Sequence, residues 1–528
     1  MAKRINRDRL LFQLFTAVGH AFLVLLLLLC AYLPGISQEN PLEKKLTIAS
    51  NRVTIYEALN LISDRIGYNF VYDSKDLESD RKVKVEAKDE PVGSVLSQLL
   101  ANSNLKVRVL DKYILLYKDE AVRSGAVAEA KVDSIQPCAI KGRIFDKDTK
   151  MPIPFATVGV AQLGIGTVSN MDGYFHLKIP ATQLVSSIAV AHLGYKSQSL
   201  PVELLSGQQV DIYLESYSIS IQEVIIRNID PVALIQRTMA QRGHVFGDSP
   251  VYLTTFYREG IEKSKDIVNY SEAVFKVYKS PYTRSPEMDQ VKLLKSRKVK
   301  NEDQRDTLWV KMKAGINASL DLDIVKSVPD FLDREFMSNY HYLKTDIVTL
   351  DSLKAYAISF EQRSDIAEPL FKGIIYITMD SLAVLGADFE INPEHVADFG
   401  SRLVVRKSRG VKVVPTKVAY SVRYKLWNGR YYLNHIRGDL DLKVKRRSRL
   451  FANSYHVFLE MAVIQIDADN VVRFARDERI KSNVVFNDLD FTYDDNFWRE
   501  FNVITPELNL QELLRKIAPK IETIEGVD

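Results

Sequence analysis

Residues 140–180 read IKGRIFDKDTKMPIPFATVGVAQLGIGTVSNMDGYFHLKIP, and this stretch decides the fold of the middle of the chain. Apolar and polar residues alternate in Ile140–Ile144 and again in Tyr174–Ile179. Between them, Asn-Met-Asp-Gly at 170–173 predicts a turn, because these residues accept the backbone angles that turns demand. Short strands at this spacing predict a small all-β sandwich over residues 138–215. Three further strands are expected: one that starts at Phe155-Ala156-Thr157-Val158, one at Ser187–His192 and one at Val210–Leu214.

The same stretch carries motifs of a known domain. They are Gly142-Arg143-Ile144-Phe145-Asp146, Pro154-Phe155-Ala156-Thr157-Val158, Thr167 and Asp172-Gly173-Tyr174-Phe175. In these motifs the region resembles the carboxypeptidase-D regulatory-like domain, a transthyretin-like sandwich. The resemblance implies a structural module and not a peptidase, since the family takes its name from an accessory domain.

Composition excludes several classes of protein. The chain has 528 residues, of which 46% are hydrophobic and 26% charged, which is typical of a globular protein of about three domains. The formal net charge is +4, and most of it comes from Lys3, Arg4, Arg7 and Arg9 at the start. The remainder is close to neutral, so electrostatics do not favour nucleic acid as a partner.

Residues 1–37 have the pattern of an export signal. A basic start precedes the apolar run Ala21–Leu33, which is shorter than the roughly 20 residues of a spanning helix. Small residues before Gln38 predict cleavage there, and an uncleaved anchor is the alternative. Cys30 follows the bulky Leu29, which disfavours a lipoprotein signal. Cys138 is then the only cysteine of the mature chain, so no internal disulfide is expected.

Residues 45–118 contain an internal repeat in which each copy predicts a strand, a helix and a strand. Apolar positions of the first copy recur 37 residues later, and two copies predict one compact domain rather than a solenoid. The matched pairs are Leu46 with Val83, Ile55 with Val92, Leu59 with Leu96, Ile62 with Leu99, Phe70 with Val107 and Tyr72 with Val109.

The motifs Val53-Thr54-Ile55-Tyr56-Glu57-Ala58-Leu59 and Gly67-Tyr68-Asn69-Phe70-Val71-Tyr72 make this repeat similar to the secretin and TonB short N-terminal (STN) domain. The resemblance implies a periplasmic protein-contact module without chemistry of its own. Residues 119–137, rich in Ala, Ser, Gly and charged residues, are predicted to form a flexible linker.

Residues 216–245 are expected to connect the sandwich to the rest through a strand at Ile221–Ile226 and a helix. Asp230-Pro231 begins that helix, with Val232, Ile235 and Met239 on one face.

Residues 246–528 are predicted to form a large antiparallel sheet, because apolar residues alternate with polar ones over long runs. Ala387, Phe389 and Ile391 are one such series, and Tyr420, Val422, Tyr424 and Leu426 are another. Asn428-Gly429 is the strongest hairpin signal in the chain. The alternation predicts one apolar face and one wet face. The remaining length is too short for the plug and 22-stranded barrel of a TonB-dependent receptor.

The runs Tyr356-Ala357-Ile358-Ser359-Phe360 and Phe371-Lys372-Gly373-Ile374-Ile375-Tyr376-Ile377 resemble the half-barrel of LolA-type lipoprotein carriers. The region resembles more closely the uncharacterised tail of envelope proteins with the same sandwich, in the motifs Phe256-Tyr257-Arg258-Glu259, Glu272-Ala273, Tyr278-Lys279 and Phe497-Trp498. We expect the helices Pro231–Gln241 and Leu508–Ile517 to cover the apolar face. Phe497 and Trp498 are expected to pack in the core, with a groove cover as the alternative. Arg258 and Glu272 are expected to pair across neighbouring strands.

A search for chemistry-bearing motifs finds little. His395 with Asp398 lacks the second ligand pair that a zinc site needs. Gly164-Ile165-Gly166 lies between strands and not at a strand-to-helix turn, which disfavours phosphate binding. The basic run Lys443, Lys445, Arg446, Arg447 and Arg449 is predicted to be a solvated strand face, with anionic lipid head groups as the alternative. We therefore predict no catalytic residue, no cofactor and no metal site.

These observations predict a multidomain α+β protein that is exported to the periplasm or the periplasmic face of the outer membrane. The leading hypothesis is a non-enzymatic adaptor or scaffold linked to TonB-dependent transport or signalling. Its expected partners are envelope proteins, including TonB-dependent receptor components, and a membrane surface. One alternative is a carrier of lipid, lipoprotein or another apolar ligand in the sheet of residues 246–528. The other is a hydrolase with an unrecognised site.

Overall fold

The computed structural model describes residues 40–480 and 501–512. Gaps within these ranges lie at 73–76, 78–80, 102, 104, 111, 119–137, 181–186, 203–204, 206–208, 218–228, 265, 284–287, 301–309, 313–314, 351–352, 408, 448–449 and 509. Several expectations lie outside the described residues: the export signal, the linker, the strand Ile221–Ile226, the pair Phe497 and Trp498, and most of the helix Leu508–Ile517.

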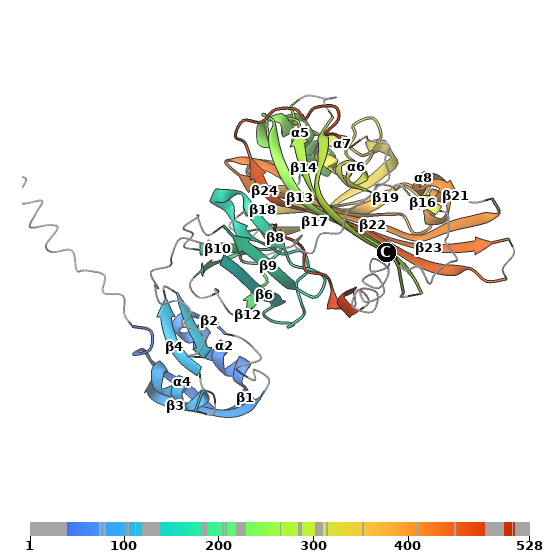
Figure 1. Ribbon diagram of the computed structural model, residues 1–528. Coiled ribbons are helices and arrows are strands. Elements are labelled where there is room, and N and C mark those ends of the chain that lie inside the picture. The colour runs from blue at the N-terminus through green and yellow to red at the C-terminus, as the bar shows by residue number, and fades with distance from the viewer. Residues whose placement is uncertain are drawn as a thin grey trace, which may run out of the picture. The chain divides into compact units, whose positions relative to one another are not determined.

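The described chain divides into two compact units (Figure 1). The first comprises the repeat region, and the second comprises the sandwich together with the large sheet, which were expected as separate domains. Within the described part of the chain, no helix combines the length and the apolar character that crossing a bilayer requires.

The first unit confirms the predicted repeat of strand, helix and strand. Helix α2 begins with a capping box, in which Thr54 accepts from the Glu57 N–H and Glu57 accepts from the Thr54 N–H. It ends at Gly67, whose φ of 74° is left-handed. The elements are β1 (Lys45–Thr54), α2 (Ile55–Ile66), β2 (Asn69–Val71), β3 (Lys82–Pro91), α4 (Val92–Leu99), β4 (Leu105–Leu110) and β5 (Tyr113–Lys118). Strand β1 pairs with β3, and β5 lies between β2 and β4.

The middle of the chain is the predicted all-β sandwich, with one sheet in the order β12-β6-β9 and the other in the order β11-β10-β7-β8. The turn at 170–173 is confirmed: the Asn170 side chain accepts from the N–H groups of Asp172 and Tyr174, and Gly173 has a φ of 81°. The strands are β6 (Cys138–Asp146), β7 (Thr157–Val160), β8 (Ile165–Val168), β9 (Tyr174–Ile179), β10 (Ser187–Ala191), β11 (Gln198–Pro201) and β12 (Gln209–Leu214).

The expected strand start at Phe155 is wrong. Phe155 has a φ of 61°, which no extended strand contains, and strand β7 begins only at Thr157. The Phe155 N–H donates to the Ser169 carbonyl at 2.9 Å, which holds this left-handed conformation.

Ten strands form the predicted antiparallel sheet, in the order β15-β14-β13-β24-β23-β22-β20-β19-β18-β17. The Asn428-Gly429 hairpin is confirmed: both residues have positive φ, 47° and 75°, and they join β22 to β23. The strands are β13 (Val251–Lys263), β14 (Asp266–Lys279), β15 (Gln290–Lys300), β17 (Tyr340–Leu350), β18 (Leu353–Gln362), β19 (Phe371–Thr378), β20 (Val384–Ile391), β22 (Val411–Trp427), β23 (Arg430–Arg446) and β24 (Asn453–Asp467).

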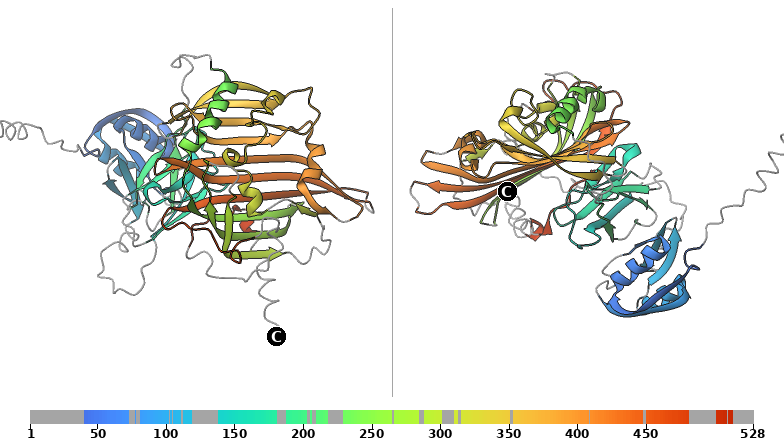
Figure 2. Two further views of the ribbon diagram at one scale, coloured as in Figure 1. Left: turned by 90° about the horizontal axis from the view of Figure 1, so that it is seen from above. Right: turned by 180° about the vertical axis from the view of Figure 1, so that it is seen from behind.

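Helices cover one face of this sheet (Figure 2, left). The Asp230 carboxylate caps α5 by accepting from the Val232 N–H at 2.9 Å, as expected. Leu234 and Ile235 of α5 share one core with Val422 of the sheet. The remaining elements are α5 (Pro231–Val245), α6 (Ile316–Leu320), α7 (Ile324–Ser327), α8 (Gly400–Leu403), the 3-10 turns η2 (Ala161–Leu163), η5 (Met337–Asn339) and η6 (Val396–Phe399), and the paired strands β16 (Val310–Met312) and β21 (Val404–Lys407).

Leu426 was expected to be covered within the apolar face, and this is wrong. Val422 and Tyr424 on the same strand are buried in the core, but Leu426 is 49% exposed. It lies next to the hairpin, at the end of the strand, although its neighbour Trp427 is buried in the core.

A buried carboxylate fastens α7 to the sheet. Asp323, at the start of α7, accepts from the Lys279 ammonium at 2.6 Å, from the Tyr282 hydroxyl at 2.8 Å and from the Tyr424 hydroxyl at 2.7 Å. Asp323 is fully buried, and three donors replace the water that its charge would otherwise keep. The polar contacts therefore fix where this short helix sits on the apolar face.

Replacing Gly173 is expected to destabilise the second unit. An added Cβ would lie 2.6 Å from the Ile144 carbonyl oxygen, in addition to the strain of positive φ. We expect Gly173→Val to lower the free energy of unfolding by about 1–3 kcal/mol. Chemical denaturation of the full chain measures this, with Gly173→Ala compared against Gly194→Ala. Gly194 also has positive φ, but an added Cβ there meets nothing within 4 Å. Equal losses for the two alanine variants would contradict the steric argument.

Candidate functional site

The face of the large sheet opposite the helices carries a row of alternating charges. One residue from each of five neighbouring strands lies directly opposite the next: Arg297 on β15, Glu272 on β14, Arg258 on β13, Glu460 on β24 and Arg437 on β23. We call these five residues the charge row. Positive and negative side chains alternate along the charge row, so each residue attracts the oppositely charged residue on the next strand.

The centre of the charge row is removed from water. Arg258 and Glu460 have fully buried side chains, and the Arg258 Nε donates to Glu460 at 2.6 Å. His435 Nε2 lies 2.9 Å from the second oxygen of Glu460. Burial alone would raise the pKa of Glu460, but Arg258, His435 and Arg437 together lower it to about 2. Glu460 is therefore charged at neutral pH in spite of its burial.

The expected pairing of Arg258 with Glu272 is only partly what the structure contains. The two residues lie directly opposite each other on β13 and β14. However, the Arg258 guanidinium makes its ion pairs with Glu460 and Glu507, while Glu272 accepts from Arg297 at 2.5 Å. Glu460 and Glu507 were missed, because they lie 202 and 249 residues from Arg258 in the sequence.

Residues 501–508, which we call the strap, lie between the charge row and the sandwich and form no regular helix or strand before Leu508. On the sandwich side, the Asn502 amide exchanges two hydrogen bonds with the backbone of Lys178 on β9, and the Leu508 N–H donates to Asp172. On the sheet side, Arg258 donates to the Thr505 carbonyl and to the Glu507 carboxylate. The strap thus connects two parts of the fold that are distant in sequence.

Apolar side chains of the strap complete this contact. Val503 and Ile504 are buried with Val168 of the sandwich and Phe256 and Val274 of the sheet. The sandwich also touches the sheet directly, since the Ile466 N–H donates to the Gly164 carbonyl at 3.1 Å. The supposed wet face of the sheet is therefore covered over this half, which corrects the expectation of a solvated face.

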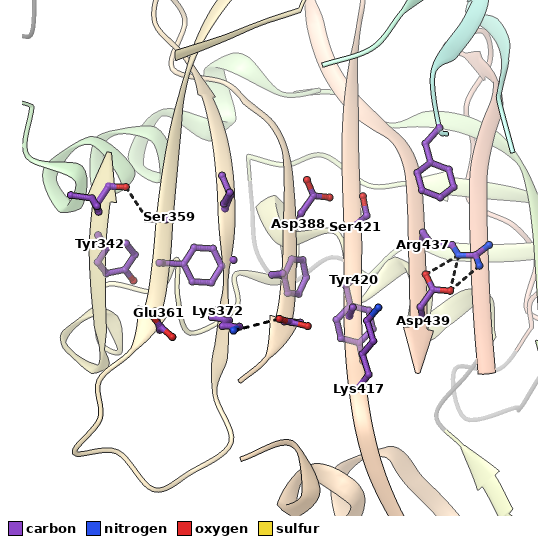
Figure 3. Close-up of a pocket in the computed structure, with 18 of the residues that line it drawn as sticks. Tyr342, Ser359, Glu361, Lys372, Asp388, Lys417, Tyr420, Ser421, Arg437 and Asp439 are labelled. Atoms are coloured by element: carbon purple, nitrogen blue, oxygen red, sulfur yellow. Dashed lines mark hydrogen bonds and ion pairs between the residues drawn. The ribbon is translucent and has the colours of Figure 1, made fainter. Parts of the chain in front are cut away.

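Beyond the strap, the same face of the sheet carries a groove of about 820 Å³ (Figure 3). The row that contains the charges continues through it, one residue per strand, as Ser421, Asp388, Ile374, Ser359 and Leu343. Arg437 belongs both to the groove and to the charge row, and Phe155 and Met171 line the groove from the sandwich. We call this feature the open-face groove.

A smaller cavity of about 340 Å³ shares Phe155, Asp388 and Ser421 with the open-face groove and adds His192 from the sandwich. Ser421, His192 and Asp388 are the residue types of a nucleophilic triad. However, both Asp388 oxygens accept from Arg423 at 2.8 Å, and neither Ser421 Oγ nor His192 Nδ1 has a hydrogen-bond partner. The serine–imidazole hydrogen bond that activates such a nucleophile is not made between these residues.

The environment of this cavity keeps its imidazole neutral. Burial, reinforced by the nearby Arg423, lowers the pKa of His192 to about 4. His192 is therefore uncharged at neutral pH, and its Nδ1 and the Ser421 Oγ are two buried polar atoms without a hydrogen-bond partner on residues that line one cavity. These two atoms suit a ligand that supplies neutral hydrogen-bonding groups.

Phe155 stands where the two cavities meet. Its ring stacks on His435 with 4.7 Å between centroids, and its backbone has the uncommon φ of 61°. Strained backbone of this kind in an aromatic residue is typical of functional sites. The consequence is that the sandwich places an aromatic ring over the open face of the sheet.

The other residues considered from sequence have ordinary surroundings. His395 begins the turn η6, where its carbonyl accepts from the Asp398 N–H. No cluster of three or more His, Cys, Asp or Glu able to hold a metal occurs among the residues that the structure describes. In the basic run, Lys443, Lys445 and Arg447 are exposed, as predicted, and Arg449 lies outside the described residues.

Comparison with known domains agrees with the two resemblances expected from sequence. Residues 140–226 match the model of the CarboxypepD_reg-like domain. Residues 68–119 match the model of the secretin and TonB N terminus short domain. The chain carries both domains. The expected ranges were 138–215 for the sandwich and 45–118 for the STN-like domain, so the matched ranges begin and end at different residues. The large sheet lies outside both matches.

Other comparisons add little. No curated protein matches the chain. Among solved structures, the chain is similar to the crystal structure of a DUF1329 family protein from Desulfovibrio piger, with 10% sequence identity, covering 46% of this chain and 96% of that chain. The TM-score of 0.20 is too low to assign a fold or a function to the large sheet.

Removing the central carboxylate of the charge row is expected to destabilise the fold in a pH-dependent way. Glu460→Gln removes the closest and most deeply buried anionic partner of Arg258 and leaves it only Glu507, so we expect a loss of about 3–5 kcal/mol in the free energy of unfolding at neutral pH. The pKa of Glu460 is about 2 in the fold, against an ordinary value of 4.5. The stabilisation is thus fully present above the ordinary value and is lost as pH falls towards 2. The difference between wild type and variant should shrink over that interval.

Denaturant titrations at several pH values measure this difference. The control is Glu478→Gln, which removes an exposed partner of Lys292 and should change stability little. A loss for Glu460→Gln that matched the control, or that did not depend on pH, would show that the charge row does not carry the stability assigned to it.

Proposed function

We propose that this protein is a non-enzymatic adaptor of the cell envelope that acts through protein contacts and is linked to TonB-dependent transport or signalling. The observation that carries the proposal is the order of its parts. An STN domain, which is associated with TonB-dependent transport and signalling, is followed by a CarboxypepD_reg-like sandwich. The sandwich is then fastened, through the strap, to a large antiparallel sheet.

The chemistry of the open face supports contact over catalysis. Ser421, His192 and Asp388 share a cavity but are not connected as a nucleophile, its base and an orienting acid. The charged residues Arg437 and Asp439 are bound to each other, as are Arg423 and Asp388. Side chains that neutralise one another in this way suit recognition of a surface and not proton transfer.

The carrier hypothesis receives less support. A carrier would need an accessible apolar cavity, but the apolar face of the sheet packs against α5, α6 and α7 in one core. The groove that is present lies on the opposite face, and charged side chains such as Glu361, Lys372 and Arg437 interrupt its apolar lining. We propose export to the periplasm or to the periplasmic face of the outer membrane, where envelope proteins are the partners.

Photo-crosslinking in the exported protein tests the adaptor proposal. A photoreactive residue at Leu61, which is 40% exposed on α2 of the STN domain, should form discrete adducts with envelope proteins. A second probe at Leu343, 65% exposed in the open-face groove, tests that face independently. Absence of discrete adducts from both positions in cells that express the protein at its natural level would count against an adaptor.

A fluorescent fatty-acyl probe separates the adaptor from the carrier. We expect no saturable binding to the exported chain, because helices cover the apolar face of the sheet. Val422→Arg places a charge in that core, whereas Leu426→Arg changes an exposed site on the same strand. Saturable binding that survives Leu426→Arg and is abolished by Val422→Arg, with the fold retained by circular dichroism, would favour the carrier.

A further inference from the structure

The strap and the open-face groove occupy successive halves of one surface. The strap begins at Phe501, whose ring lies 5.8 Å from the Lys295 ammonium of β15, and reaches Arg437 of β23 through Glu507 at 3.7 Å. It therefore crosses the strands from β15 to β23. The groove begins at the same Arg437 and continues to Leu343 on β17, at the opposite edge of the sheet.

Both halves of this surface are bounded by the same floor and the same side wall. The floor is the row of cross-strand residues that contains the charge row and continues from Ser421 to Leu343. The side wall is the sandwich, whose turn at 170–173 holds the strap through Asn170 and Asp172 and lines the groove through Met171. One half of this surface thus already holds an extended polypeptide, and the other half is a groove of matching construction.

We propose that the open-face groove binds an extended polypeptide segment of a partner protein, lying across strands β23 to β17 as the strap lies across β15 to β23. This inference rests on the adaptor function proposed above and names the surface where one partner binds. Six strands about 4.8 Å apart span about 24 Å, which an extended segment of about seven residues covers.

The lining indicates the chemistry of that segment. Acidic Glu361, Asp388, Glu390 and Asp439 are nearly balanced by basic Lys372, Lys417 and Arg437, so the groove selects for neither net charge. The closest of these charges already pair within the groove, as Figure 3 shows for Arg437 with Asp439 and for Lys372. The partner segment should therefore carry little net charge and bind with weak salt dependence.

Specific contacts are available to such a segment. Leu343 of the sheet and Met171 of the sandwich are 65% and 46% exposed and offer apolar contact in the groove. The Ser421 hydroxyl and His192 Nδ1 are buried and unpartnered, so peptide N–H and C=O groups are suitable partners for them. Phe155, held in its left-handed conformation, supplies an aromatic ring beside these atoms.

An array of peptides of about 12 residues, with random sequences of low net charge, tests the proposal. The full exported chain is applied to the array, and fluorescence anisotropy then measures the affinity of the selected peptides. We expect saturable binding that changes little with salt. Leu343→Arg and Ser421→Tyr, which add charge or bulk in the groove, should each weaken binding at least about tenfold.

The matched control is Leu426→Arg, which makes the same change at an exposed leucine outside the groove and should leave peptide affinity unchanged. Thermal melting checks that each variant is folded, and Leu343→Arg remains informative if Ser421→Tyr does not fold. No saturable binding, or binding unaffected by Leu343→Arg, would overturn the proposal. So would selective displacement of the peptides by a synthetic peptide of residues 513–528, because the chain's own end would then be the occupant.

The experiment separates failure of this inference from failure of the adaptor function. Adducts from the Leu61 probe that persist in the Leu343→Arg variant, together with no peptide binding, would keep the adaptor and remove the groove as its contact surface. Adducts from Leu343 that map by mass spectrometry to an extended, charge-balanced segment would support both.

Discussion

The buried ion pair between Arg258 and Glu460 is the constraint on which the second unit depends. Two charges without solvent in the middle of a sheet cost several kcal/mol each unless they are fully paired. Neighbouring strands supply part of the pairing through Arg437 and His435, and the strap supplies the rest through Glu507. The electrostatics therefore require the strap to lie where it does, and the strap in turn brings the sandwich to the sheet.

This arrangement gives the two faces of the sheet different roles. Helices close one face mainly by apolar packing, and the buried carboxylate of Asp323 fixes the position of α7 on it. On the other face, hydrogen bonds and ion pairs determine position, and those that hold the strap reach as far as Arg437. The rest of that face is the open-face groove, so the limit of the charge row is also the edge of the groove.

The CarboxypepD_reg-like sandwich acts here as a wall as well as a module. Its turn at 170–173 holds the strap, and Phe155 and Met171 project over the groove. The left-handed φ of Phe155 is stabilised by a hydrogen bond to the Ser169 carbonyl, so local strain is compensated within the sandwich. The sandwich thereby helps to shape the surface that we propose for partner binding.

The sequence by itself determined the features that depend on local pattern. The 37-residue repeat, the turn at 170–173, the hairpin at Asn428-Gly429 and the alternation through Phe389 each follow from backbone preference or from periodic burial. Only the tertiary structure decided which charges meet. Glu460 and Glu507 reach Arg258 across more than 200 residues of chain, and the strap has no periodicity that marks its partners. Phe155 differs from expectation because its backbone bonds to the Ser169 carbonyl and its ring packs on the distant His435, neither of which alternation along one strand encodes. Leu426 is exposed beside the hairpin, although the alternation groups it with the buried Val422 and Tyr424.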